Sequence, residues 1–147
     1  KYPPGHVSIL LNSTDKINYS DASISSQNGS GVIKENLSVY WNCKAHLCYV
    51  KKRKWVGCCR FVSVFPDVNK VISFAESKLK TPYCTELNKF LTAKGRTDCY
   101  ICSTITWRSF WEDDFEIHRL EARWMPTIAP SDIYLSDRVI PKIFIKE

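Results

Sequence analysis

Seven cysteines in a chain of 147 residues are the feature that most restricts how this sequence can fold. In so short a chain, this density favours a framework of disulfide bonds over reduced thiols. Because disulfides persist in oxidising compartments, we expect the protein to be secreted and extracellular. The count is odd, so one thiol is left over, either free or joined to another chain. The cysteines stand at positions 43, 48, 58, 59, 84, 99 and 102.

Four N-glycosylation sequons agree with secretion. They are clustered within the first 38 residues, and none follows. A glycan requires an exposed acceptor in a secreted chain. Residues 12–38 are rich in serine, asparagine, aspartate and glycine, so they are predicted to form a flexible, glycosylated extension, with one short strand at Val7–Leu11. The acceptors are Asn12, Asn18, Asn28 and Asn36.

Composition and charge narrow the class of protein. Hydrophobic residues make up 44% of the chain, enough for a packed core. No apolar run reaches the roughly 18 residues that a spanning helix needs, so we expect no membrane insertion. Residues 43–107 carry twelve basic and four acidic side chains, a net charge of +8 within a chain of +6. A basic secreted body suggests a polyanionic partner, although a solvated surface is an equally good interpretation.

Apolar patterns predict an α+β layer. Val71–Ala75, Leu87–Thr92 and Asp98–Ile105 are expected to be strands, with a turn at residues 94–96. From Trp107 onward, the aromatic residues fall at helical spacing, and Pro126 is expected to end that helix. The predicted fold is a three-stranded antiparallel sheet with one C-terminal helix packed across it, plus extended N- and C-terminal segments.

The cysteine spacing, together with a short motif, resembles the CC chemokine family. The adjacent pair Cys58-Cys59 is followed after 24 residues by Cys84 and after another 14 by Cys99. Between the last two cysteines, a Phe-Leu-Thr string at 90–92 leads into Lys-Gly-Arg at 94–96, and Trp107 follows. The resemblance implies a glycosylated extension over 1–57, a chemokine-like domain over 58–122 and a tail over 123–147.

The same resemblance implies a disulfide pattern. Cys58 would pair with Cys84, and Cys59 with Cys99. A body of this size needs such bonds because it buries little apolar surface. Of the remaining cysteines, Cys43 and Cys48 would close a small loop, or one of them would pair with Cys102. The implied core consists of Ile72, Phe74, Leu87, Phe90, Trp107, Phe110 and Phe115.

Two binding surfaces also follow from the resemblance. Contacts to a chemokine G-protein-coupled receptor would come from Gly57, Arg60, Phe61, Val62, Phe65 and Lys70. Contacts to glycosaminoglycans would come from Lys89, Lys94 and Arg96, extended by Lys51, Lys52, Arg53 and Lys54. The basic run at 51–54 has two further interpretations, as a solvated loop or as a protease site that releases a product beginning near Trp55.

Several features depart from the family pattern and leave two functions open. In this chain, 57 residues precede the cysteine pair, Arg60 separates the pair from Phe61, and a long tail follows the predicted helix. The first function is a secreted ligand that directs leukocyte migration. The second is a virus-encoded chemokine-fold glycoprotein that serves as a subunit of an entry or adhesion complex, or as a non-signalling decoy. Its partner would be a second copy or a disulfide-linked glycoprotein.

Catalytic and metal chemistry find little basis in the sequence. Cys99 and Cys102 form half of a zinc motif, but no second C-x-x-C exists, and the three histidines are scattered. No histidine stands at a recognisable spacing from a nucleophile, and His118 is expected on a helix surface. We therefore expect neither an enzyme nor a bound metal or cofactor.

Overall fold

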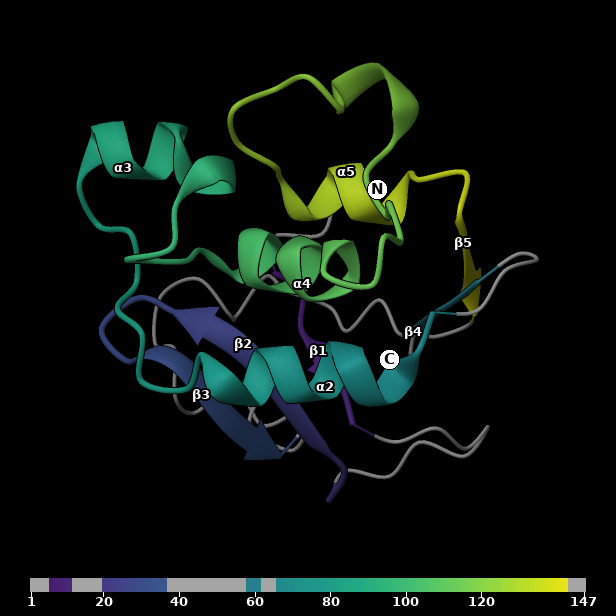
Figure 1. Cartoon of the computed structure of the whole chain (residues 1–147), viewed down its shortest axis with the longest axis horizontal. Coiled ribbons are helices and arrows are strands. Elements are labelled where there is room, and N and C mark those ends of the chain that lie inside the picture. Colours follow the sequence, from purple (N-terminus) through teal and green to yellow (C-terminus); the bar gives the residue numbers. More distant parts are fainter. Residues whose placement is uncertain (1–5, 12–19, 37–57, 62–65, 143–147) are drawn as a thin grey trace, which may run out of the picture.

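The structure is a computed structural model that describes residues 6–11, 20–36, 58–61 and 66–142. It contains two antiparallel sheets and several short helices (Figure 1). The larger sheet has the strand order β1–β2–β3, and the smaller one pairs β4 with β5. The strands are β1 (Ile9–Leu10), β2 (Ala22–Gln27), β3 (Gly31–Asn36), β4 (Cys58–Phe61) and β5 (Val139–Lys142). The helices are α2 (Val68–Ser77), α3 (Leu87–Leu91), η2 (Ala93–Gly95), α4 (Cys102–Trp111), η3 (Leu120–Ala122) and α5 (Pro130–Tyr134).

The α+β class is confirmed, but other residues build the three-stranded antiparallel sheet. Its strands lie within residues 9–36, where the sequence predicted one short strand, at Val7–Leu11, which contains β1, and otherwise a flexible extension. The central strand β2 hides Ser23, Ser25 and Ser26 completely from solvent. Serine counts as polar in a hydropathy pattern, yet it is small enough to pack beneath a helix when its hydroxyl is hydrogen-bonded. Ser26 Oγ meets this condition by donating to the Tyr100 carbonyl oxygen at 2.7 Å.

The three predicted strands between residues 71 and 105 are wrong, because the segments are largely helical. Val71–Ala75 lies within α2, Leu87–Thr92 contains α3, and the second half of Asp98–Ile105 begins α4. Helix α2 begins where the Asp67 carboxylate accepts from the amides of Asn69 and Lys70 at 3.0 and 3.4 Å. A capped start of this kind favours a helix over a strand. The two buried residues, Val71 and Ala75, stand four apart, which is the spacing of one helix face.

The C-terminal helix ends much earlier than Pro126. Helix α4 ends at Trp111, and Asp114 then takes the left-handed conformation with φ +55°. The Phe115 amide donates to the Phe110 carbonyl at 3.1 Å, and the Asp114 amide donates to the Trp111 carbonyl at 2.9 Å. These two bonds define a Schellman motif, and the contact of the Phe110 and Phe115 rings completes it. The chain turns back at this point, because the last carbonyls of α4 already have partners.

Core packing crosses both of the expected domain boundaries, after residue 57 and after residue 122. The first hydrophobic cluster joins Ile9 and Ile24 of the sheet to Val71 and Ile105 of the helices. The second joins α4 to the C-terminal segment, which was expected to be extended but contains α5. Helix α4 also packs directly on β2 and on α2. The second cluster consists of Trp107, Phe115, Ile117, Ile128 and Ile133.

Candidate binding surface

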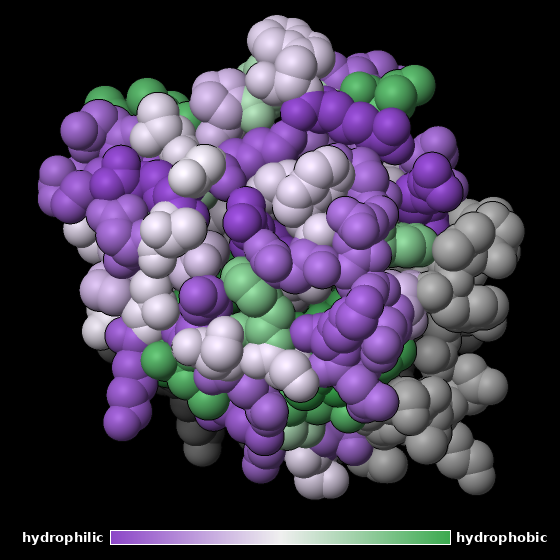
Figure 2. All heavy atoms as spheres, viewed as in Figure 1, coloured by the Kyte–Doolittle hydropathy of each residue, from purple (hydrophilic) through white to green (hydrophobic). Residues whose placement is uncertain are grey.

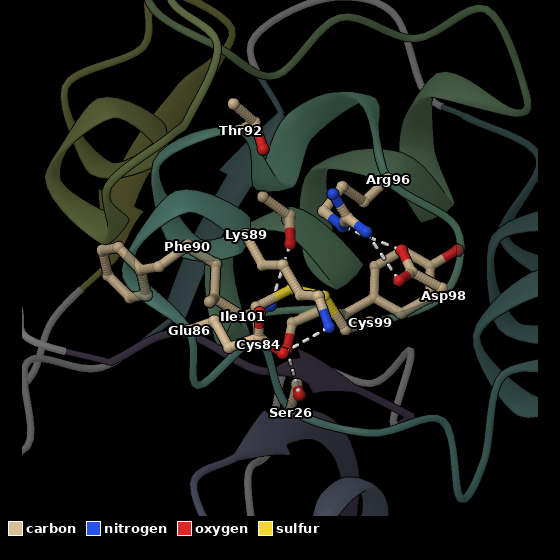
Figure 3. Close-up of a disulfide and its surroundings, with 12 residues drawn as sticks. Ser26, Cys84, Glu86, Lys89, Phe90, Thr92, Arg96, Asp98, Cys99 and Ile101 are labelled. Carbon is tan, nitrogen blue, oxygen red and sulfur yellow. Dashed lines mark hydrogen bonds and ion pairs between the residues drawn. A yellow bond between two sulfur atoms is a disulfide. The ribbon is translucent and has the colours of Figure 1, made fainter.

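A disulfide closes the segment from Cys84 to Cys99, which we call the disulfide loop (Figure 3). The chemokine resemblance implied that Cys84 pairs with Cys58 and Cys99 with Cys59. Both pairings are corrected, because Cys84 and Cys99 are bonded to each other. The two ends of the loop already lie side by side in the backbone. The Cys84 amide donates to the Tyr100 carbonyl at 3.2 Å, and the Tyr100 amide donates to the Pro82 carbonyl at 3.0 Å. The pairing therefore follows from the way the neck of the loop is hydrogen-bonded.

Helix α3 lies within this loop and has no buried residue. Leu87, the first residue of the helix, is 73% exposed, and Phe90 and Leu91 are exposed as well. Leu87 and Phe90 were both expected in the core, so this expectation is wrong for them, whereas Trp107 and Phe115 are buried as predicted. Large apolar side chains at positions i, i+3 and i+4 share one face of a helix. Helix α3 thus presents an apolar face without covering it.

A second exposed apolar group lies in the segment around η3. Trp124 is 80% exposed and Leu120 is 62% exposed, and Met125 is exposed beside them. Two hydrogen bonds hold this segment against the disulfide loop. Thr127 Oγ1 donates to the Phe90 carbonyl at 3.1 Å, and the Lys94 amide donates to the Pro126 carbonyl at 3.1 Å. The segment and the loop therefore form one part of the surface.

We call these six residues together the apical surface. They account for six of the nine large hydrophobic side chains that are exposed among the described residues. Figure 2, in the orientation of Figure 1, shows hydrophobic residues at the upper edge of the molecule, over α3 and over the segment around η3. Exposed apolar groups that are scattered singly need no explanation, but several on two adjoining segments make this part of the surface a candidate for binding a partner. The apical surface consists of Leu87, Phe90, Leu91, Leu120, Trp124 and Met125.

The basic residues expected to bind glycosaminoglycans lie in the disulfide loop, but their charges are largely matched. Lys89 pairs with Glu86, and Arg96 donates to both carboxylate oxygens of Asp98 at 2.8 and 2.6 Å. The Arg96–Asp98 pair raises the pKa of the guanidinium and lowers the pKa of the carboxyl. Lys94 points away from solvent into the network described below. Residues 51–54, the other part of that expected site, lie outside the described residues.

The residues expected to contact a receptor are divided between two elements. Arg60 and Phe61 lie in β4, opposite Ile140 and Val139 of β5. Lys70 lies on α2, where its ammonium pairs with the Asp113 carboxylate at 3.1 Å. This hydrogen-bonded pair raises the pKa of Lys70. The bond from the Asp67 amide and then the bond from Lys70 lower the pKa of Asp113. Gly57, Val62 and Phe65 lie outside the described residues.

Two of the four sequons can be placed, and both acceptors are exposed. Asn28 lies in the turn between β2 and β3, where Gly29 adopts φ +86°, and Asn36 ends β3. In Figure 1, the sheet occupies the lower half of the molecule, whereas α3 and the segment around η3 lie at the top. Asn12, Asn18, Cys43 and Cys48 lie outside the described residues, and Cys102 is buried at the start of α4.

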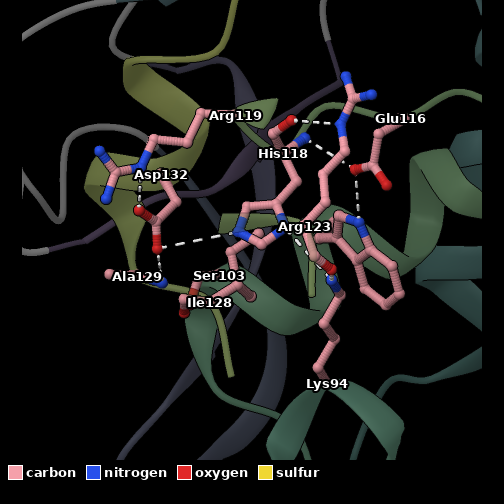
Figure 4. A network of polar contacts seen from close by, with 10 residues as sticks. Lys94, Ser103, Glu116, His118, Arg119, Arg123, Ile128, Ala129 and Asp132 are labelled. Carbon is pink, nitrogen blue, oxygen red and sulfur yellow. Dashed lines mark hydrogen bonds and ion pairs between the residues drawn. The ribbon is translucent and has the colours of Figure 1, made fainter. Parts of the chain in front are cut away.

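A polar network lies beneath the apical surface and includes a fully buried histidine (Figure 4). His118 was expected on a helix surface, but it is 0% exposed, because the chain turns back after Asp114 and carries it inward. Its Nδ1 is 3.2 Å from Lys94 Nζ. Its Nε2 is 3.9 Å from Asp132 Oδ2, which is too far for a hydrogen bond, and this nitrogen has no hydrogen-bond partner among the described residues.

The two carboxylates of the network are already engaged. Asp132 accepts from Arg119 Nε at 2.7 Å and from the Ala129 amide at 2.8 Å. Glu116 accepts from Trp107 Nε1 at 2.9 Å and from the His118 amide at 2.8 Å. Hydrogen bonds therefore hold both carboxylates in place. The arrangement fixes the segment between α4 and α5 against the body of the protein.

The sequence offered only weak signals for the residues of the apical surface and of the polar network. Trp124 lies in a segment that alternates charged and apolar residues, and nothing in that pattern distinguishes an exposed tryptophan from a buried one. The role of Asp132 depends on α5, which lies in the segment expected to be extended. No signal in the sequence alone would have paired Lys94 with His118, because 24 residues separate them.

No protein-family model matches the chain, and neither a curated protein nor a solved structure is similar to it. None of the described helices is long and apolar enough to cross a membrane. Within the described ranges, no group of three or more His, Cys, Asp or Glu side chains is placed to hold a metal ion.

Proposed function

We propose that this protein is a secreted, disulfide-stabilised glycoprotein that binds a partner at cell surfaces through its apical surface. The observation that carries the proposal is the grouping of six exposed apolar side chains on two adjacent segments. A disulfide that closes the loop between Cys84 and Cys99 limits the freedom of α3 before binding. Such preorganisation lowers the entropy cost of association. The exposed sequons at Asn28 and Asn36 support the assignment to the secretory route.

Between the two functions expected from the sequence, an adhesive or complex-forming role has more support than receptor signalling. The signalling role depended on an arrangement in which Cys58 and Cys59 tether the N-terminal segment to a sheet over 71–105. Helices occupy these positions, and Cys84 and Cys99 bond to each other. A glycosaminoglycan partner has less support, because Lys89 and Arg96 are already paired with carboxylates. A protein partner suits an apolar surface better, since aromatic anchors contribute most of the energy at such interfaces.

A pair of matched variants tests the proposal. Leu87→Ser with Trp124→Ser removes the two most exposed apical side chains, and Val68→Ser with Leu135→Ser removes exposed apolar residues outside the apical surface. We expect the apical variant to lose about tenfold or more of its binding to cells, because hot-spot truncations each cost about 1–2 kcal/mol or more. The control variant should bind like the unmodified protein. Equal binding by both variants, with circular dichroism spectra unchanged, would refute the proposed surface.

A further inference from the structure

Lys94 fastens the disulfide loop to the body of the protein. Its backbone amide donates to the Pro126 carbonyl at 3.1 Å. Its ammonium donates to the Arg123 carbonyl and to His118 Nδ1, and lies 4.9 Å from the centre of the Trp107 ring. Lys94 belongs to η2, directly after α3, so these contacts determine how the helix is held. Figure 4 shows the side chain reaching from the loop toward the histidine.

The contact between Lys94 and His118 requires a neutral imidazole. An ammonium group has three donors and no acceptor, so Nδ1 must offer its lone pair. The ring hydrogen is then on Nε2. Protonation would place a second N–H on Nδ1, opposite the lysine ammonium at 3.2 Å. Two cations at that distance in a buried site repel each other, so the contact would change from a hydrogen bond to a repulsion.

The two carboxylates near His118 raise its pKa, but they offset this repulsion only in part. From α5, Asp132 faces Nε2 but is bonded to Arg119 and to the Ala129 amide. From the preceding segment, Glu116 is bonded to Trp107 and to the His118 amide. Arg119 and, behind Lys94, Arg123 add positive charge. Burial and the neighbouring Lys94 both lower the pKa of His118, and burial lowers the pKa of Lys94.

We propose that His118 is a pH-operated latch on the disulfide loop, whose protonation in acidic surroundings releases Lys94 and loosens the loop that carries α3. The proton comes from solvent and is added to Nδ1, while Nε2 keeps its own. Release frees the ammonium to reach water, and the hydrogen bond between the Lys94 amide and Pro126 weakens with it. The apical surface would then be altered in acidic compartments. Only this last consequence depends on the proposed function, because the loosening itself requires no partner.

Amide hydrogen exchange measured by NMR tests the latch on the full chain. The reporter is the Lys94 amide, bonded to Pro126, and the reference is the Val32 amide, bonded to the Thr81 carbonyl at 2.8 Å. After correction for intrinsic rates, we expect the protection of the Lys94 amide to fall severalfold, on the order of tenfold, between pH 7.5 and pH 5.0. The protection of the Val32 amide should stay constant. No fall at Lys94, or an equal fall at both amides, overturns the latch.

Three variants attribute the change to His118. His118→Asn keeps an acceptor for Lys94 but cannot be protonated in this range, so its Lys94 protection should not depend on pH. Lys94→Gln keeps a donor without the charge, so the response at the amide of residue 94 should shrink, which provides a second test if the first variant does not fold. The matched control, His6→Asn with His46→Asn, should retain the full response. A response that persists in His118→Asn, that is undiminished in Lys94→Gln, or that disappears in the control contradicts the proposal.

The latch and the binding function can fail separately. If the Lys94 amide opens at pH 5.0 but the apical variants bind cells normally, the latch stands and the proposed function fails. If the apical variants lose binding but the Lys94 amide shows no pH response, the proposed function stands and the latch fails.

Discussion

Gly31 lies against the Thr81 carbonyl so closely that a Cβ on Gly31 would be 2.3 Å from that oxygen. The contact brings the start of β3 to the neck of the disulfide loop, where the Val32 amide donates to the Thr81 carbonyl and the Lys80 amide donates to the Val32 carbonyl, both at 2.8 Å. Only glycine fits here, because the residue also adopts φ +71°. Gly31 thus allows the larger sheet to approach the neck of the disulfide loop closely.

Gly31→Ala is therefore expected to destabilise the protein by about 2 kcal/mol or more, because the left-handed conformation alone costs about 1–2 kcal/mol and the carbonyl must also move. Gly29→Ala should cost less, since its φ is also positive but nothing lies within 4 Å of the added Cβ. Gly95→Ala, which has neither problem, should have little effect. Urea unfolding of the three variants measures this order, and a Gly31 variant as stable as the Gly95 variant would contradict the close approach.

Asp114→Gly is expected to stabilise the protein by about 1 kcal/mol, because glycine adopts the left-handed conformation of a Schellman motif without strain. Asp114→Val should instead destabilise it, since a β-branched residue is a genuine outlier at φ +55°. The side chain of Asp114 is exposed, so neither change removes a buried contact. Thermal unfolding followed by circular dichroism checks both signs. If the two variants melted at the same temperature, α4 would not end in this motif.

The free energy of unfolding should fall as the pH drops below about 6.5, the ordinary pKa of histidine. The lowered pKa of His118 means that the unfolded chain takes up a proton before the folded chain does. Stability therefore rises with pH through this window and is fully present above it. Urea titrations at pH 7.5 and pH 5.0 measure the difference, which should shrink in His118→Asn. An unchanged difference in that variant would assign the pH dependence to other groups.

Expression in a eukaryotic secretory system should attach glycans at Asn28 and Asn36, because both side chains are exposed at the ends of β-strands. Asn28→Gln and Asn36→Gln should each remove one glycan from the secreted protein. Electrophoresis and mass spectrometry should show each loss as a decrease in mass. Enzymatic removal of all N-glycans should bring the variants and the unmodified protein to the same mass. A protein that leaves the cell with neither site occupied would contradict the proposed secretory route.

Sequence patterns predicted the class of fold and the short strand that contains β1, but they assigned the other strands to the wrong residues. The serines of β2 concealed a central strand, because hydropathy marks Ser23, Ser25 and Ser26 as surface residues. Val71 and Ala75 fit a five-residue strand and one face of a helix equally well, and the capping Asp67 decides for the helix. The end of α4 depends on the backbone conformation of one aspartate, Asp114, which a periodicity argument cannot detect.

The site was predictable only in part. Cys84 and Cys99 were recognised as disulfide residues, but their pairing depends on the backbone contact between residues 82–84 and Tyr100, which is not visible in cysteine spacing. Lys89 was expected on a strand, and Lys94 and Arg96 in the following turn; they lie instead on α3, on η2 and directly after η2, within the disulfide loop. Their charges were misjudged, because the matching carboxylates and the buried histidine depend on tertiary structure.

Peptide mapping of the secreted protein under non-reducing conditions tests the central claim most directly, because the apical surface and the latch both require the closed disulfide loop. The structure predicts a peptide pair that joins Cys84 to Cys99. In the chain-entropy model, closing a loop of this length stabilises the folded protein by about 3 kcal/mol. Peptides that join Cys58 to Cys84 and Cys59 to Cys99 would contradict the structure and restore the chemokine arrangement.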